Sequence, residues 1–232
     1  MKTEMKKTIV TSFILSLALT LSAQVNVSIL GDSYSTYEGW NPEGSAIWYD
    51  KNHRNDVDNV NQTWWYQLIE DNGLALELNN SYSGATICNT GYNGADFSDR
   101  SFLTRSANLG ENPDLIFVFG GTNDAWAGSP IGEENGTDMY TVRPAAKAMF
   151  KNIKTNYPDA LCVAIINTEL SKDVENAIIE ACEIEKVPYV KLESIDKQAG
   201  HPSINGMKQI SHQVWKSTAP HLYEKLKGKS GK

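Results

Sequence analysis

The sequence has no surplus of basic residues. Its 232 residues include 21 Lys+Arg against 28 Asp+Glu, which gives a formal net charge of −7. An acidic chain is a poor partner for the phosphate backbone of a nucleic acid. We therefore expect no nucleic-acid partner.

Cysteine, histidine and nucleotide-binding motifs are scarce as well. The three cysteines (Cys88, Cys162 and Cys182) have no C-x-x-C spacing, and the sequence leaves open whether two of them pair. The four histidines fit no H-E-x-x-H pattern, which argues against a zinc site. Neither G-x-G-x-x-G nor G-x-x-x-x-G-K-[ST] occurs after a predicted strand, so a nucleotide-binding protein is not indicated.

Long hydrophobic runs are missing except near the start of the chain. Lys2, Lys6 and Lys7 precede an apolar run at 9–21, and Ser22-Ala23 follows it. This order predicts a secretory signal peptide over 1–23, because the run is shorter than the roughly 20 residues of a spanning helix. A membrane anchor is the alternative. No cysteine follows for lipidation, so we expect a secreted or periplasmic protein without stable membrane insertion.

The remaining residues, 24–232, predict one α/β domain. Hydrophobic residues make up 41% and charged residues 21% of the chain, which is typical of a globular protein. Short apolar runs predict five strands covered on both faces, as in a parallel sheet; they lie at 25–30, 74–78, 114–119, 161–166 and 187–192. Helical patterns alternate with them, at 64–71, 144–157, 171–186 and 203–227, the last interrupted near Pro220. An aromatic-rich insertion at about 34–62 and a Gly-rich stretch at 125–140 do not fit the alternation.

Candidate catalytic residues follow the predicted strands. In a parallel sheet, ligands bind at the carboxyl ends of the strands. Ser33 follows the first strand and could act as a nucleophile, although an isolated Gly-Asp-Ser is more often a helix cap. Gly84 would allow close approach of the backbone to a ligand. Asn123 could donate a hydrogen bond toward the same point, and His201 is the residue type of a general base.

Four segments, taken together and in this order, resemble the SGNH (GDSL-like) hydrolase family; they are Gly31-Asp-Ser-Tyr-Ser35, Gly84, Gly121-Thr-Asn-Asp124 and His201-Pro202. The resemblance implies a flavodoxin-like three-layer α/β/α sandwich with a five-stranded parallel sheet. It also implies a carboxylic ester hydrolase with Ser33 as nucleophile and His201 as base. The implied oxyanion hole consists of the Ser33 and Gly84 N–H groups and the Asn123 side chain. No metal ion or organic cofactor is implied.

The sequence departs from the family at the acidic member of the triad. The usual position, three residues before the histidine, is Gln198, and the nearest carboxylate is Asp196. We expect Asp196 to complete the triad; otherwise a backbone carbonyl or Gln198 holds the ring of His201 and a dyad acts. Asp32 and Asp124 are expected to fix the two loops by hydrogen bonds to the backbone.

The substrate is inferred from aromatic residues near the nucleophile. Tyr34, Trp40, Trp48 and Trp126 are expected to bind substrate, since aromatic rings stack on sugars and also suit acyl chains. Together with export they favour a carbohydrate O-acyl substrate, most simply an acetyl ester on a polysaccharide or glycan. The expected partner is therefore a small-molecule or polysaccharide ester. The alternatives are a lipase, lysophospholipase or thioesterase acting on longer acyl chains, and a non-catalytic carbohydrate-binding module. The sequence does not indicate an oligomeric state.

Overall fold

The computed structural model describes residues 24–52 and 54–230. Five strands form one parallel sheet in the order β2-β1-β3-β4-β5. They are β1 (Asn26–Gly31), β2 (Ala75–Ser81), β3 (Leu115–Phe119), β4 (Leu161–Ile166) and β5 (Tyr189–Lys191). This confirms the predicted flavodoxin-like sheet. The predicted signal peptide at 1–23 lies outside the described residues.

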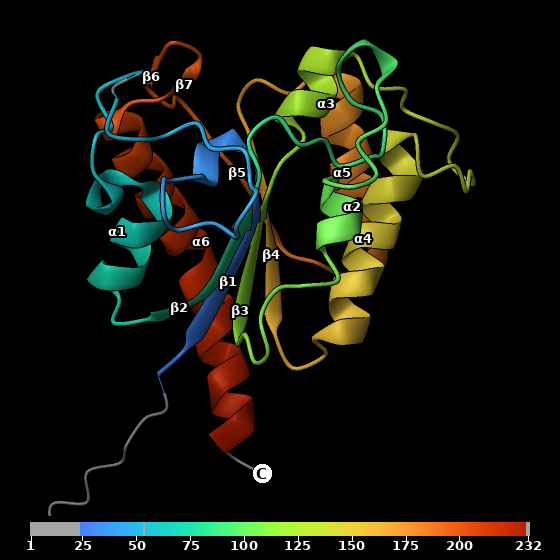
Figure 1. Cartoon of the computed structure of the whole chain (residues 1–232). Helices are drawn as coiled ribbons and strands as arrows, with labels where there is room; N and C mark the ends of the chain where they lie inside the picture. Colours follow the sequence, from blue (N-terminus) through green and yellow to red (C-terminus); the bar gives the residue numbers. More distant parts are fainter. Residues whose placement is uncertain (1–23, 53, 231–232) are drawn as a thin grey trace, which may run out of the picture.

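Helices cover both faces of the sheet, as Figure 1 shows: α1 and α6 pack on one face, and α2, α4 and α5 lie on the other. The helices are α1 (Trp64–Asp71), α2 (Phe102–Arg105), α3 (Thr122–Ala127), α4 (Val142–Asn156), α5 (Lys172–Glu185) and α6 (Ile204–Ser230). Three short 3₁₀ turns are η1 (Ser33–Ser35), η2 (Val60–Gln62) and η3 (Tyr92–Gly94).

Alternation along the strands builds two hydrophobic cores. In β3, Leu115, Phe117 and Phe119 pack in the core beneath α1 and α6, whereas Ile116 and Val118 pack beneath α4 and α5. Successive side chains of a strand point to opposite faces, so a strand between two helical layers is apolar throughout. That double burial is the origin of the continuous apolar runs in the sequence.

The last helix differs from its prediction. α6 continues through Pro220 and is not broken there. Proline removes one backbone donor and strains the preceding turn, but Val214 and Leu222, on either side of it, are buried in the core beneath α1 and α6. We attribute the continuity of α6 to this packing.

The aromatic insertion is packed against the domain. Tyr49 is 1% exposed, and its hydroxyl donates to the Pro202 carbonyl at 2.8 Å. The Tyr37 hydroxyl donates to the Asp58 carbonyl at 2.7 Å.

All three cysteines are buried and free. Within residues 24–52 and 54–230, no helix is both apolar enough and long enough to cross a membrane.

The register places three strand ends side by side. Gly31 at the end of β1 pairs with Ser81 of β2 and with Phe119 of β3. The segments that follow these residues therefore leave the sheet at the same edge, where a doubly wound sheet binds its ligand.

Candidate active site

Ser33 lies on a tight turn directly after β1. Asp32 caps this turn: its carboxylate accepts a hydrogen bond from the Tyr34 N–H at 3.0 Å. A side chain at Gly31 would collide with Ser35 and Ser81, so only glycine allows the chain to turn here. Ser33 is buried, with 4% of its surface exposed.

His201 reaches Ser33 from a small antiparallel hairpin. The hairpin consists of β6 (Lys197–Gln198) and β7 (His201–Pro202), joined by Ala199 at φ 50° and Gly200 at φ 75°. Two consecutive positive φ angles are typical of the turn that closes a two-residue hairpin. His201 Nε2 lies 2.9 Å from Ser33 Oγ.

The second ring nitrogen of His201 determines which tautomer is present. Nδ1 lies 3.2 Å from the carbonyl oxygen of Ala199. A carbonyl oxygen can only accept, so Nδ1 carries the proton and the lone pair lies on Nε2. In this form Nε2 can accept the hydroxyl proton of Ser33, as a general base must.

Asp196 does not have the position expected of a triad acid. Its carboxylate accepts a hydrogen bond from the Ser203 hydroxyl, and that hydroxyl accepts the Gly206 N–H at 3.1 Å. Asp196 lies before β6, outside the hairpin, and its carboxylate is occupied at the start of α6. The Ala199 carbonyl, in place of a carboxylate, accepts the hydrogen bond from His201 Nδ1. Gln198 is exposed. In the structure the ring of His201 is thus held by a backbone carbonyl and not by the Asp196 carboxylate.

Gly84 and Asn123 approach the same strand edge from two loops. Gly84 follows β2 with φ 83°, a conformation that side chains disfavour; no acceptor for its N–H lies among the described residues. Asn123 lies in the first turn of α3, and its Nδ2 donates to the Ala85 carbonyl at 2.9 Å. The Asp124 carboxylate joins the two loops, since it accepts the Ile87 N–H at 2.8 Å.

Burial sets the charge of the site. It lowers the pKa of His201 to about 4, and the nearby positive charges of Lys197 and Arg54 act in the same direction. The hydrogen bond to the Ala199 carbonyl opposes this shift. The imidazole is thus neutral at pH 7, which is the form that accepts a proton.

Burial also raises the pKa of the Asp32 carboxyl, which caps the turn at Ser33, to about 7.

Two of the four aromatic residues expected at the substrate flank His201. The Trp48 ring stacks on the imidazole with centroids 3.6 Å apart and an interplanar angle of 9°. Trp126, 44% exposed, stands edge-on at 6.2 Å. The other two are placed differently. Tyr34 also contacts the imidazole, edge-on with centroids 5.1 Å apart, but it is fully buried and its hydroxyl donates to the Gly200 carbonyl, so it supports the hairpin from beneath. Trp40 packs on Trp65 and Tyr66, away from His201.

A family model for GDSL-like lipases and acylhydrolases matches residues 25–218. The chain belongs to the GDSL-like lipase/acylhydrolase family. It is therefore an ester hydrolase, as the motifs at the strand ends predicted. None of the curated proteins matches this chain.

Solved structures agree with this family and fold. A candidate GDSL-like lipase from Bacteroides uniformis is 48% identical, with a TM-score of 0.82 and coverage of 86% of this chain and 97% of that chain. A candidate GDSL-like lipase from Bacteroides ovatus is 45% identical, also with a TM-score of 0.82, and the coverages are 85% and 99%. A family two carbohydrate esterase from Clostridium thermocellum, in complex with cellohexaose, is 16% identical. Its TM-score is 0.63 over 85% of this chain and 64% of that chain, which shows a shared fold alone.

Sequence reasoning left open a backbone carbonyl at the ring of His201 but could not say which one, because every residue has a carbonyl; in the structure it belongs to Ala199. Sequence reasoning missed the Tyr92 hydroxyl, which donates to Asn123 Oδ1 at 2.7 Å. Tyr92 belongs to a loop that carries none of the family motifs, so its position becomes visible only in the fold.

Proposed function

We propose that this ester hydrolase acts through a Ser33–His201 dyad and an acyl-enzyme intermediate. The observation that carries the proposal is the 2.9 Å contact between Ser33 Oγ and His201 Nε2, with Nδ1 held by the Ala199 carbonyl. A nucleophile, a base and a group that orients the base are the parts that covalent ester hydrolysis needs. Asp196 is not part of this proposed dyad.

The proposed reaction has two halves. Ser33 Oγ bonds to the carbonyl carbon of the ester, its proton passes to His201 Nε2, and the carbonyl oxygen becomes an oxyanion. The N–H groups of Ser33 and Gly84 and the free N–H of Asn123 Nδ2 donate to that oxyanion. The oxyanion then collapses, the bond to the alcohol oxygen breaks, and His201 returns its proton to this leaving group. Water attacks the acyl-enzyme with the same base, releasing the carboxylic acid and restoring Ser33.

The proposed substrate is an O-acyl ester of a carbohydrate, most simply an O-acetyl ester. Trp48 and Trp126 flank the base, and the exposed ring of Trp126 offers a surface on which a sugar ring can stack. The basic start and short apolar run at 1–23 support export to a compartment where polysaccharides are found. A carbohydrate esterase that was crystallised with cellohexaose has the same fold, which supports the proposal.

Hydrolysis of p-nitrophenyl acetate by residues 24–232, compared with Ser33→Ala, tests the chemistry. We expect turnover in the native protein and background rates in the variant, because the covalent route is lost. Equal background rates in both would contradict catalysis and favour a binding role.

Release of acetate from acetylated xylan tests the substrate class. We expect this release to exceed the hydrolysis of p-nitrophenyl palmitate and of lysophospholipid. Activity confined to the two long-chain esters would contradict the proposed substrate and indicate a lipase.

A further inference from the structure

The side-chain amide of Asn123 is held at both ends. Nδ2 donates to the Ala85 carbonyl at 2.9 Å, and Oδ1 accepts the Tyr92 hydroxyl at 2.7 Å. The Ala85 carbonyl can only accept, so it fixes the amide with nitrogen toward Ala85 and oxygen toward Tyr92. The nitrogen has two hydrogens, and one of them remains for a ligand. Asn123 is 3% exposed, so a vacant Oδ1 would be buried.

The Tyr92 hydroxyl is suited to remain a donor. Burial raises its pKa above the usual 10, and the negative charges of Asp32 and Asp124 act in the same direction. The hydroxyl therefore keeps its proton throughout the neutral range. Donation to Oδ1 also withdraws electron density from the amide, which strengthens the remaining N–H as a donor.

The loop that carries Tyr92 has a defined backbone. The Gly91 N–H donates to the Ala95 carbonyl at 2.8 Å, and the Phe97 N–H donates to the Asn89 carbonyl at 2.8 Å. Asn93 at φ 55° and the following glycine, also at positive φ, form the tip. Tyr92 thus lies at the tip of a small hairpin.

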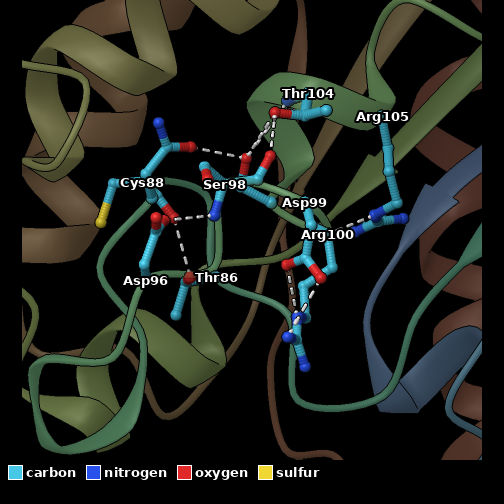
Figure 2. A network of polar contacts seen from close by, with 10 residues as sticks. Thr86, Cys88, Asp96, Ser98, Asp99, Arg100, Thr104 and Arg105 are labelled. Atoms are coloured by element: carbon cyan, nitrogen blue, oxygen red, sulfur yellow. Dashed lines mark hydrogen bonds and ion pairs between the residues drawn. The ribbon is translucent and has the colours of Figure 1, made fainter.

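Side chains anchor the base of this hairpin to helices on either side. Figure 2 shows the Asp96 carboxylate accepting the Ser98 N–H at 2.8 Å, and the Thr104 hydroxyl of α2 donating to the Ser98 carbonyl at 2.7 Å. On the other side, the Ser129 hydroxyl, just after α3, donates to the Thr90 carbonyl at 2.9 Å. The loop is therefore fixed relative to α3, the helix that carries Asn123.

We propose that Tyr92 is a positioning residue of the oxyanion hole, which acts by holding and polarising the amide of Asn123. The inference rests on the proposed function, in which Asn123 donates to the oxyanion. In this arrangement the loop at 89–97 positions Tyr92, and the Tyr92 hydroxyl orients the amide of Asn123. The Asn123 amide then donates to the oxyanion.

Tyr92→Phe tests the proposal because it removes one oxygen atom and keeps the ring. Complete loss of an oxyanion donor costs on the order of 10²–10³ in kcat, and we expect the loosened donor to lose about tenfold. KM should change by less than about twofold, since the interaction strengthens only in the transition state.

Tyr157→Phe is the matched control. The Tyr157 hydroxyl also has a 2.7 Å hydrogen bond, accepting the Leu109 N–H, but it lies after α4, away from the carboxyl ends of the strands. This variant should lower thermal stability and leave kcat unchanged. An unchanged kcat in Tyr92→Phe, or an equal loss in both variants, would overturn the proposal.

A double-mutant cycle with Asn123→Ala identifies the route of the effect. If Tyr92 acts through Asn123, Tyr92→Phe should have no further effect on kcat once the amide is gone. A full tenfold loss in that background would overturn the proposal. If Ser33→Ala abolishes turnover but Asn123→Ala leaves kcat unchanged, the inference about Tyr92 fails while the nucleophile stands. If Ser33→Ala is fully active, the proposed function itself fails.

Discussion

Replacing Asp196 by asparagine separates a dyad from a triad. In the structure the Asp196 carboxylate accepts the Ser203 hydroxyl, while the His201 ring is bonded to the Ala199 carbonyl. Asp196→Asn removes the charge and keeps an oxygen acceptor of the same size. We expect kcat to change by less than about threefold, whereas loss of a true triad acid costs ~10⁴.

We expect Asp196→Asn to lower the free energy of unfolding rather than kcat. The bond from Ser203 to Asp196 is part of the cap on α6, and a hydrogen bond of this kind contributes about 1 kcal/mol to the free energy of unfolding. Asp196 is exposed, so solvent screens its charge and the charged bond adds little beyond that. For a domain of this size, about 1 kcal/mol corresponds to a decrease of roughly 2–4 °C in Tm.

The assay is p-nitrophenyl acetate turnover beside a thermal melt, with Ser203→Ala as the matched control. Ser203→Ala removes the hydrogen bond altogether, and with it the acceptor of the Gly206 N–H, whereas Asp196→Asn keeps an acceptor for the Ser203 hydroxyl. The decrease in Tm should therefore be larger for Ser203→Ala than for Asp196→Asn, and both variants should keep nearly native kcat. A loss of 10³ or more in kcat for Asp196→Asn, with Tm unchanged, would refute the dyad. It would show that Asp196 reaches His201 when substrate is bound.

Three further outcomes follow from the electrostatics and stacking of the site. Because burial lowers the pKa of His201 to about 4, kcat/KM should stay near its maximum down to about pH 5 and fall as the pH drops through about 4; a decline centred near 6.5 would contradict this. Trp48→Leu should lower kcat by on the order of tenfold, since the ring stacked on His201 stabilises the imidazolium, and Trp48→Phe should retain most activity; equal kcat in native protein and Trp48→Leu would be inconsistent with that role. Burial raises the pKa of Asp32 from 3.8 to about 7, so the folded state binds the extra proton, and stability should decrease as the pH rises from 4 to 7; Asp32→Asn should flatten the Tm–pH curve in this range, and an unaltered slope would assign the effect to other groups.

The centre of the sheet could be predicted from the sequence because β3 and β4 are buried on both faces, whereas the edge strands β2 and β5 are partly exposed. Runs such as 115–119 and 161–166 are apolar at every position, and parallel pairing follows from the helical segments between them. The short elements could not be predicted. β6 and β7 have two residues each and α2 has four, so no periodicity can develop in them.

The part of the candidate site that consists of motif residues could be predicted from the sequence. Ser33, Gly84, Asn123 and His201 lie where the sequence places them, at the carboxyl edge of the sheet. The partner of His201 Nδ1 could not be singled out, because the sequence leaves Asp196, Gln198 and a main-chain carbonyl open and in the structure Nδ1 contacts the Ala199 carbonyl. The stacking of Trp48 on His201 depends on the path of the insertion at 34–62, and no local sequence pattern predicts that path.

The two-residue turn between β6 and β7 makes His201 and the carbonyl that orients it neighbours along the chain. When an acid elsewhere in a fold orients a histidine, thermal movement between the two segments changes the alignment of the ring. Here both partners belong to residues 199–201, so a displacement of the hairpin carries them together. The hairpin at 197–202 therefore contains both the base and the group that sets its tautomer, while Tyr34 and Tyr49 fix the hairpin to the rest of the domain. For the same reason, the side chains at 196 and 198 take no part in setting that tautomer.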